Sequence, residues 1–150
     1  MPFRYRLQKF LEIRIKKKEE QLQEVVKAQA EVDRILLLIQ KNKAKIKQTI
    51  ADMRKSDPQM YEAFDRYLKS LYDEDERLNE ELQKALENLE HQKELLRERE
   101  KEVNVLEKHK ENKREEYIKE EKAAELKLLN EIGSQKHYAK SVEKRQENGD

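Results

Sequence analysis

Cysteine and tryptophan are absent from this chain of 150 residues, and glycine and proline occur twice each. Without cysteine there can be no disulfide, thiolate nucleophile or Cys-based zinc site. With Gly133 and Gly149 as its only glycines, the chain lacks a glycine-rich loop for nucleotide phosphates. No apolar run approaches the roughly 20 residues that span a bilayer, and charged residues interrupt the N-terminus where a secretory signal needs an apolar segment. We therefore expect neither a nucleotide-hydrolysing domain nor a membrane or secretory segment.

Patterns typical of catalytic or metal sites are missing as well. None of the histidines, His91, His109 and His137, follows a glutamate by three residues, so the Glu-x-x-His pattern of di-iron bundles is absent. No serine or threonine is placed as an activated nucleophile. The 34 Lys and Arg residues balance 33 Asp and Glu residues, whereas nucleic-acid binding depends on net positive charge. We predict a protein that is not an enzyme, without catalytic residues, cofactor, metal, small-molecule substrate or nucleic-acid partner.

Charged residues make up 45% of the sequence, and apolar residues recur among them at helical spacing. Alternating steps of four and three residues visit Leu22, Val25, Gln29, Val32, Leu36, Ile39, Lys43, Ile46, Ile50 and Met53. We call this line the first seam, because a heptad pattern predicts the face that packs on a partner helix. Its regularity argues against disorder, which the high charge would otherwise favour. The polar Gln29 and Lys43 are expected to fix register or partner number.

The sequence Ser56-Asp57-Pro58 interrupts the pattern, because proline cannot continue a helix and Asp57 can cap a new one. A second seam then follows, at Phe64, Leu68, Leu71, Asp75, Leu78, Leu82, Ala85, Leu89, Gln92, Leu96, Arg99, Val103 and Leu106. The break at 56–58 therefore separates a helix of about 3–55 from a helix that begins near residue 58.

The second helix is predicted to end at Gly133. Its seam weakens over residues 107–116 and resumes at Tyr117 and Leu128, and glycine readily adopts the left-handed conformation that ends helices. We therefore expect this helix to span about 58–132, followed by a polar, partly disordered tail at 134–150.

Charge predicts how the two helices pair. Residues 41–47 are rich in lysine, whereas residues 73–76 and 80–81 are acidic. An antiparallel hairpin lays these segments alongside each other, while a parallel homodimer would stack the lysines. The predicted fold class is all-α: a long two-helix antiparallel coiled-coil hairpin over residues 1–133. A short, separately packed helix at 58–72, near the bend, is an alternative for that segment.

The N-terminal stretch FRYRLQKFLEIR interleaves aromatic and basic residues. The hairpin register places Phe3, Tyr5 and Leu7 near Tyr117 and Ile118. The cations of the stretch would then project outward as a basic collar, formed by Arg4, Arg6, Lys9 and Arg14. A membrane-surface helix is the alternative for this stretch.

A second aromatic group follows the break and comprises Tyr61, Phe64, Tyr67 and Tyr72. These residues either pack at the bend or form a docking surface, since exposed aromatic residues are favoured anchors for partners.

The opening FRYRLQKFLEIRIKKKEEQ resembles the start of the FliJ family, the small coiled-coil proteins of the flagellar type III export apparatus. The matching residues are Phe3, Tyr5, Arg6, Leu7, Gln8, Leu11 and Arg14. Chain length, the break one third of the way along and the LLNEIG segment near the C-terminus agree with the family along nearly the whole chain. Asn130 departs from the family pattern, in which Asp often precedes Glu131.

The resemblance implies a non-enzymatic stalk, because FliJ proteins are similar in shape to the two-helix stalk of rotary ATPases. The implied partners are the hexameric export ATPase, a membrane protein of the export gate and export chaperones, in the cytoplasm at the periphery of the inner membrane. The implied ring contacts are Phe3, Arg4, Tyr5, Arg6, Gln8, Arg14, Tyr117, Leu129, Asn130 and Glu131. The implied gate or chaperone contacts are Tyr61, Phe64, Tyr67 and Tyr72. The stalk of an injectisome-type secretion system and a generic coiled-coil scaffold are the alternatives.

Overall fold

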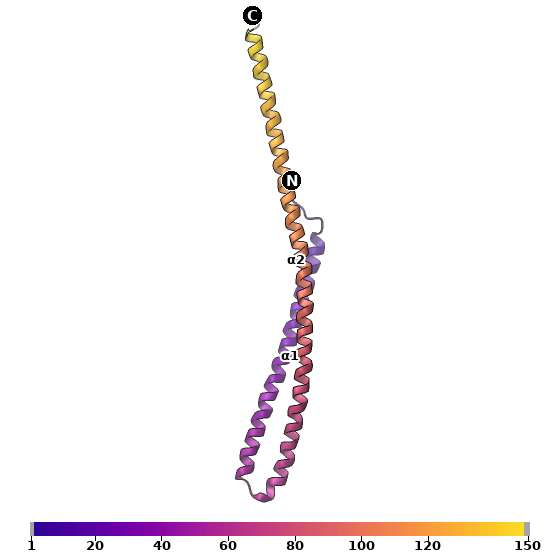
Figure 1. Ribbon diagram of the computed structural model, residues 1–150, viewed down its shortest axis with the longest axis vertical. Coiled ribbons are helices and arrows are strands. Elements are labelled where there is room, and N and C mark those ends of the chain that lie inside the picture. The colour runs from indigo at the N-terminus through magenta and orange to yellow at the C-terminus, as the bar shows by residue number, and fades with distance from the viewer. Residues whose placement is uncertain (1, 149–150) are drawn as a thin grey trace. The chain divides into compact units, whose positions relative to one another are not determined.

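The computed structural model describes residues 2–148, which form two long helices joined by one helical turn. Helix α1 spans Gln8–Lys55, the 3-10 turn η1 spans Pro58–Met60, and helix α2 spans Tyr61–Asn148 (Figure 1). The chain divides into two compact units, residues 12–103 and residues 1–11 with 104–150. We call them the hairpin unit and the terminal unit. The all-α prediction is confirmed, and none of the described helices has the length and hydropathy of a membrane span.

Within the hairpin unit, α1 and α2 lie side by side in opposite directions (Figure 1). The Gln21 side-chain amide donates to Oε1 of Gln92 at 2.7 Å, and the Asn42 amide donates to the carbonyl oxygen of Leu71 at 2.9 Å. As the residue number on α1 rises from 21 to 42, the number of its partner on α2 falls from 92 to 71, as an antiparallel pair requires. The predicted antiparallel hairpin is confirmed.

The bend forms because each helix end is capped by its own residues. The Ser56 hydroxyl and backbone N–H both donate to the carbonyl oxygen of Met53, which closes the last turn of α1. Asp57 then has extended backbone angles and accepts the backbone N–H of Gln59, while Pro58 begins the next turn. Proline suits a first helical turn, where its missing N–H has no partner to lose. In place of a separately packed helix at 58–72, a single turn leads directly into α2.

Both outer helix boundaries differ from the prediction. Helix α1 begins at Gln8 and not at residue 3. Residues 2–5 have no regular secondary structure, and Arg6 and Leu7 form a turn in which the backbone N–H of Gln8 donates to the carbonyl oxygen of Tyr5. Helix α2 passes through Gly133 to Asn148, so the predicted stop at Gly133 is wrong. Gly133 has no positive φ. A glycine inside a helix costs only about 1 kcal/mol relative to alanine, and no proline follows to enforce an end.

The second seam is confirmed from Phe64 to Leu106, where each of its positions is buried or half-buried, whereas Leu128, where the seam was predicted to resume, is exposed. Every second position of the first seam lies one residue earlier than predicted, and these positions are Gln21, Ala28, Ile35, Asn42 and Thr49. Ile35 is 2% exposed and packs in one cluster with Ile39 and Leu78, whereas Leu36 is exposed. Residues 35–39 read ILLLI, so apolar character could not show which leucine faces inward.

The polar positions of the first seam are corrected in the same way. Gln29 and Lys43 are exposed, while Asn42 is 6% exposed. Because the Asn42 amide donates to Leu71 across the hairpin, it satisfies a buried donor in one register. A buried asparagine of this kind is typical of coiled coils that fix their register.

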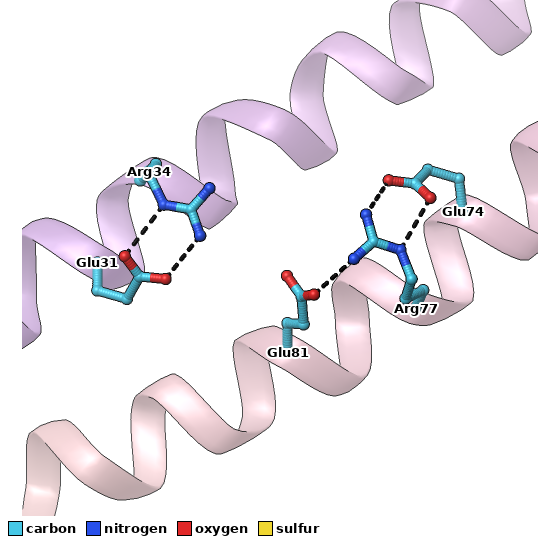
Figure 2. Close-up of polar contacts among 5 residues, drawn as sticks. All are labelled: Glu31, Arg34, Glu74, Arg77 and Glu81. Atoms are coloured by element: carbon cyan, nitrogen blue, oxygen red, sulfur yellow. Dashed lines mark hydrogen bonds and ion pairs between the residues drawn. The ribbon is translucent and has the colours of Figure 1, made fainter.

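Ion pairs line the exposed faces of the hairpin unit (Figure 2). Two nitrogens of Arg34 donate to the two carboxylate oxygens of Glu31 at 2.6 and 3.0 Å, and Arg77 contacts Glu74 in the same way. The hydrogen bonds from these arginines lower the pKa of the Glu31 and Glu74 carboxyls. The negative charge of Glu81 also raises the pKa of Arg34. Glu81 therefore lies near Arg34, whereas the sequence predicted it beside the lysines of residues 41–47. Because these pairs are exposed, solvent screens them and they contribute little to stability.

Candidate partner interface

The N-terminal residues pack on α2 within the terminal unit. The Tyr5 side chain is 8% exposed; its hydroxyl donates to the carbonyl oxygen of Leu106 at 3.3 Å and lies 2.7 Å from Nδ1 of His109. In its Nδ1–H tautomer, the histidine can donate to that hydroxyl. The rings of Phe3 and Tyr117 are tilted against each other with centroids 5.6 Å apart. The predicted neighbour Tyr117 is confirmed for Phe3, while Tyr5 bonds to Leu106 and His109, about two to three turns earlier on α2.

A cleft of about 540 Å³ separates these N-terminal residues from the facing side of α2. Its lining alternates apolar and charged groups and comprises Phe3, Arg4, Tyr5, Arg6, Leu7, His109, Lys113, Glu116, Tyr117 and Glu120. Burial, together with the carboxylate of Glu121, raises the pKa of the Tyr117 hydroxyl. Tyr117 therefore stays neutral at physiological pH. The cleft offers aromatic surface between cations and carboxylates, an arrangement suited to a protein partner.

The predicted contact residues fall into two groups by exposure. Arg4 and Arg6 are exposed on either side of the buried Tyr5, and Leu129, Asn130 and Glu131 are exposed on α2. The burial of Tyr5 leaves both arginines on the exposed side of the N-terminal stretch. These five residues are accessible to a partner.

The remaining predicted contacts are engaged within the chain. The Lys110 ammonium donates to Oε1 of Gln8 at 2.8 Å, which ties the first turn of α1 to α2 in the terminal unit. In the hairpin unit, Nη1 of Arg14 lies 3.0 Å from Oε2 of Glu102. Arg14 is half-buried, so the prediction that it projects outward with the collar is wrong. The corrected first seam continues toward the N-terminus from Gln21 through Lys18 to Arg14, where the Arg14 guanidinium bridges the two helices.

Beyond the cleft, α2 continues within the terminal unit as a single helix (Figure 1). Every residue from Ile118 to Lys140 is exposed. Several of them are large and apolar, namely Ile118, Leu126, Leu128, Leu129, Ile132 and Tyr138. An exposed apolar group of this size on one helix is typical of an interaction surface.

A model of the family described as flagellar FliJ protein matches residues 3–141. The chain belongs to the FliJ family. It is therefore a component of flagellar protein export, and the family is a structural part of that apparatus without known enzymatic activity. The comparison with curated proteins and the comparison with solved structures each give no match.

In this FliJ-family chain the second aromatic group is mostly accessible. Tyr61, Tyr67 and Tyr72 are exposed, and only Phe64 is half-buried. Tyr61 and Tyr72 are eleven residues apart, about three helical turns, so they lie on the same face of α2. Packing at the bend accounts for Phe64 but not for the three tyrosines.

Sequence reasoning missed the residues of α2 that complete the cleft. His109 was interpreted as a solvated helix residue, and Lys113, Glu116 and Glu120 belong to the segment in which the second seam weakens. The register of the hairpin was the available signal. Extending the pairing of Gln21 with Gln92 toward the N-terminus brings Tyr5 to the level of His109.

Proposed function

We propose that this chain acts as a non-enzymatic stalk of the flagellar export apparatus, whose terminal unit contacts the hexameric export ATPase. The observation that carries the proposal is the alternation at the N-terminus: Tyr5 is buried, and Arg4 and Arg6 beside it are exposed. The cations are thereby held in place by a buried anchor. Arginine in such a position is a frequent anchor of protein interfaces.

The exposed part of α2 supplies the second half of the proposed ring contact. Leu129, Asn130 and Glu131 lie within its apolar group, and Phe3 and Tyr117 line the cleft below it. A stalk that contacts the ring subunits unequally changes ATP turnover only if its affinity differs between their conformations. We infer that the terminal unit has this differential affinity, while Tyr5, Gln8 and Arg14 act indirectly by holding the helices together.

The tyrosines near the bend are the proposed contact of the export gate or of export chaperones. Tyr61, Tyr67 and Tyr72 are exposed in the hairpin unit, and tyrosine is enriched among residues that dominate binding energy. In this proposal the chain works in the cytoplasm, at the periphery of the inner membrane, and regulates the ATPase with one unit while it binds the gate or a chaperone with the other.

The test is stimulation of the purified cognate export ATPase by the purified chain. We expect Arg4→Ala with Arg6→Ala to reduce the stimulation several-fold, because two exposed charged anchors are lost. Helicity measured by circular dichroism should not change, since both residues precede α1. The matched control is Lys16→Ala with Lys17→Ala, two exposed cations of the hairpin unit. Equal stimulation by the wild type and the arginine variant would refute the ring contact.

A further inference from the structure

The exposed part of α2 has a self-complementary order of charges. Residues 115–125 contain five acidic and two basic residues, a net charge of −3. Residues 135–145 contain one acidic and four basic residues, a net charge of +3. Between them, residues 126–134 read LKLLNEIGS and carry most of the exposed apolar side chains. The segment thus has an acidic flank at 115–125, an apolar centre at 126–134 and a basic flank at 135–145, and the two flanks are equal in length.

We propose that, when the chain is not bound to the ATPase ring, residues 115–145 of α2 pair antiparallel with the same residues of a second copy of this chain. The dimer would cover Leu129, Asn130 and Glu131, so it and the proposed ring contact exclude each other. Antiparallel pairing places each acidic flank beside the basic flank of the other copy and brings the two apolar centres together. A twofold interface requires this kind of pattern, because each patch must be complementary to itself. A parallel pair would instead place acidic beside acidic and basic beside basic, which is unfavourable.

The register follows from the apolar centre. With Leu129 of one copy opposite Ile132 of the other, Glu125 meets Lys136 of the second copy and Glu121 meets its Lys140. At 100° per residue, Glu125 and Lys136 lie on the same side of the helix within about 20° of each other. In an antiparallel pair, groups on the same side are the ones that meet across the interface.

Burial of apolar surface supplies the attraction. Leu128, Leu129 and Ile132 are 57%, 59% and 40% exposed, and they cover about 100° of the helix circumference. A helix face of this width is typical of one that packs on another helix.

Sedimentation equilibrium of the full-length chain tests the pairing, without any ATPase. We expect the wild type to dimerise, and two variants to dimerise at least about tenfold more weakly: Glu121→Lys with Glu125→Lys, and Lys136→Glu with Lys140→Glu. Each substitution acts twice in a twofold interface. The decisive result is the mixture of the two variants, whose flanks again have opposite signs and which should form a heterodimer.

A control variant, Lys16→Glu with Lys17→Glu, changes the same number of charges on an exposed part of the hairpin unit and should dimerise like the wild type. A wild type that remains monomeric up to millimolar concentration would overturn the proposal and leave this face to other partners. A mixture that does not associate would overturn the charge-paired register.

Distances between spin labels test the orientation, which is simple because the chain has no cysteine of its own. Labels at Glu131→Cys should lie close together across the dimer, near its centre. Labels at Ser141→Cys should be about 30 Å apart, because each lies about ten residues from the centre at 1.5 Å per residue. Short distances at both positions would show a parallel pair and refute the antiparallel one.

Discussion

The same helix, α2, has two environments. In the hairpin unit its leucines face α1, and Leu78 is 2% exposed; in the terminal unit Leu129 is 59% exposed. Both leucines lie in sequence rich in charged residues, DERLNEEL around Leu78 and ELKLLNE around Leu129. Burial therefore depends on whether a facing helix is present, and local composition does not determine it. Most helical stability comes from such packing, since an isolated helix is only marginally stable in water.

The contrast indicates how the two regions divide their tasks. In the hairpin unit, the buried Asn42 and the cluster of Ile35, Ile39 and Leu78 hold one register. In the terminal unit, the apolar side chains of residues 118–140 are available for binding. A protein that must present a surface without unfolding benefits from this separation, because the surface does not have to contribute to stability.

The largest effect is expected when leucine is replaced by alanine in the hairpin unit, in comparison with the same replacement in the terminal unit. Leu78→Ala should lower the free energy of unfolding by about 2–5 kcal/mol, as buried leucines do, and Leu129→Ala should change it by less than about 0.5 kcal/mol. Urea unfolding followed by circular dichroism, at a concentration low enough to keep the chain monomeric, measures both. If the two variants lose equal stability, the terminal unit has a packed core and the comparison fails.

A smaller effect concerns Gly133, where the terminal unit departs from the sequence-based prediction. Nothing lies within 4 Å of the position where a Cβ would be added, and Gly133 has no positive φ. Gly133→Ala should therefore stabilise the helix by about 0.5–1 kcal/mol. Hydrogen exchange of the amides of residues 134–148 should become slower.

Whether Gly133→Ala stabilises or destabilises the segment distinguishes a helix that continues through residue 133 from one that ends there. If Gly133 ended the helix in the left-handed conformation, alanine would be strained there, and exchange after it would become faster. Leu126→Ala, on the same part of α2, serves as the control, since it removes an exposed side chain without relieving a glycine.

Much of the fold followed from the sequence because its signals are local. The break at Ser56–Pro58 depends on proline and capping chemistry, and the second seam has one apolar face, so both were predicted correctly. The first seam was displaced at alternate positions because both Ile35 and Leu36 fit a heptad, and only contact with α2 distinguishes them. Glycine at 133 was misread because a glycine permits a helix end but does not require one.

The candidate interface was predictable only in part. The exposure of Arg4 and Arg6 followed from the interleaved pattern, whereas the engagement of Arg14 with Glu102 and the position of His109 beside Tyr5 depend on register to within one turn. A displacement of the seam by one residue rotates a side chain by about 100°, enough to move it between seam and surface. Sequence patterns therefore predict which face of a helix is buried, but they do not predict which two residues contact each other across the hairpin.

The smallest expected effect tests whether surface ion pairs contribute to the difference between the regions. The hydrogen bond from Arg34 lowers the pKa of Glu31 in the folded chain, so this pair stabilises the fold above the unfolded-state pKa and ceases to do so as the pH falls through the lowered value. Arg34→Gln should return the pKa of Glu31 toward its ordinary value, as measured by NMR titration of its side-chain carboxyl, while Arg97→Gln should leave that pKa unchanged. Because both partners are exposed, we expect no measurable change of the stability at neutral pH. A measurable loss would mean that charged surface networks, as well as the seam, hold the hairpin unit together.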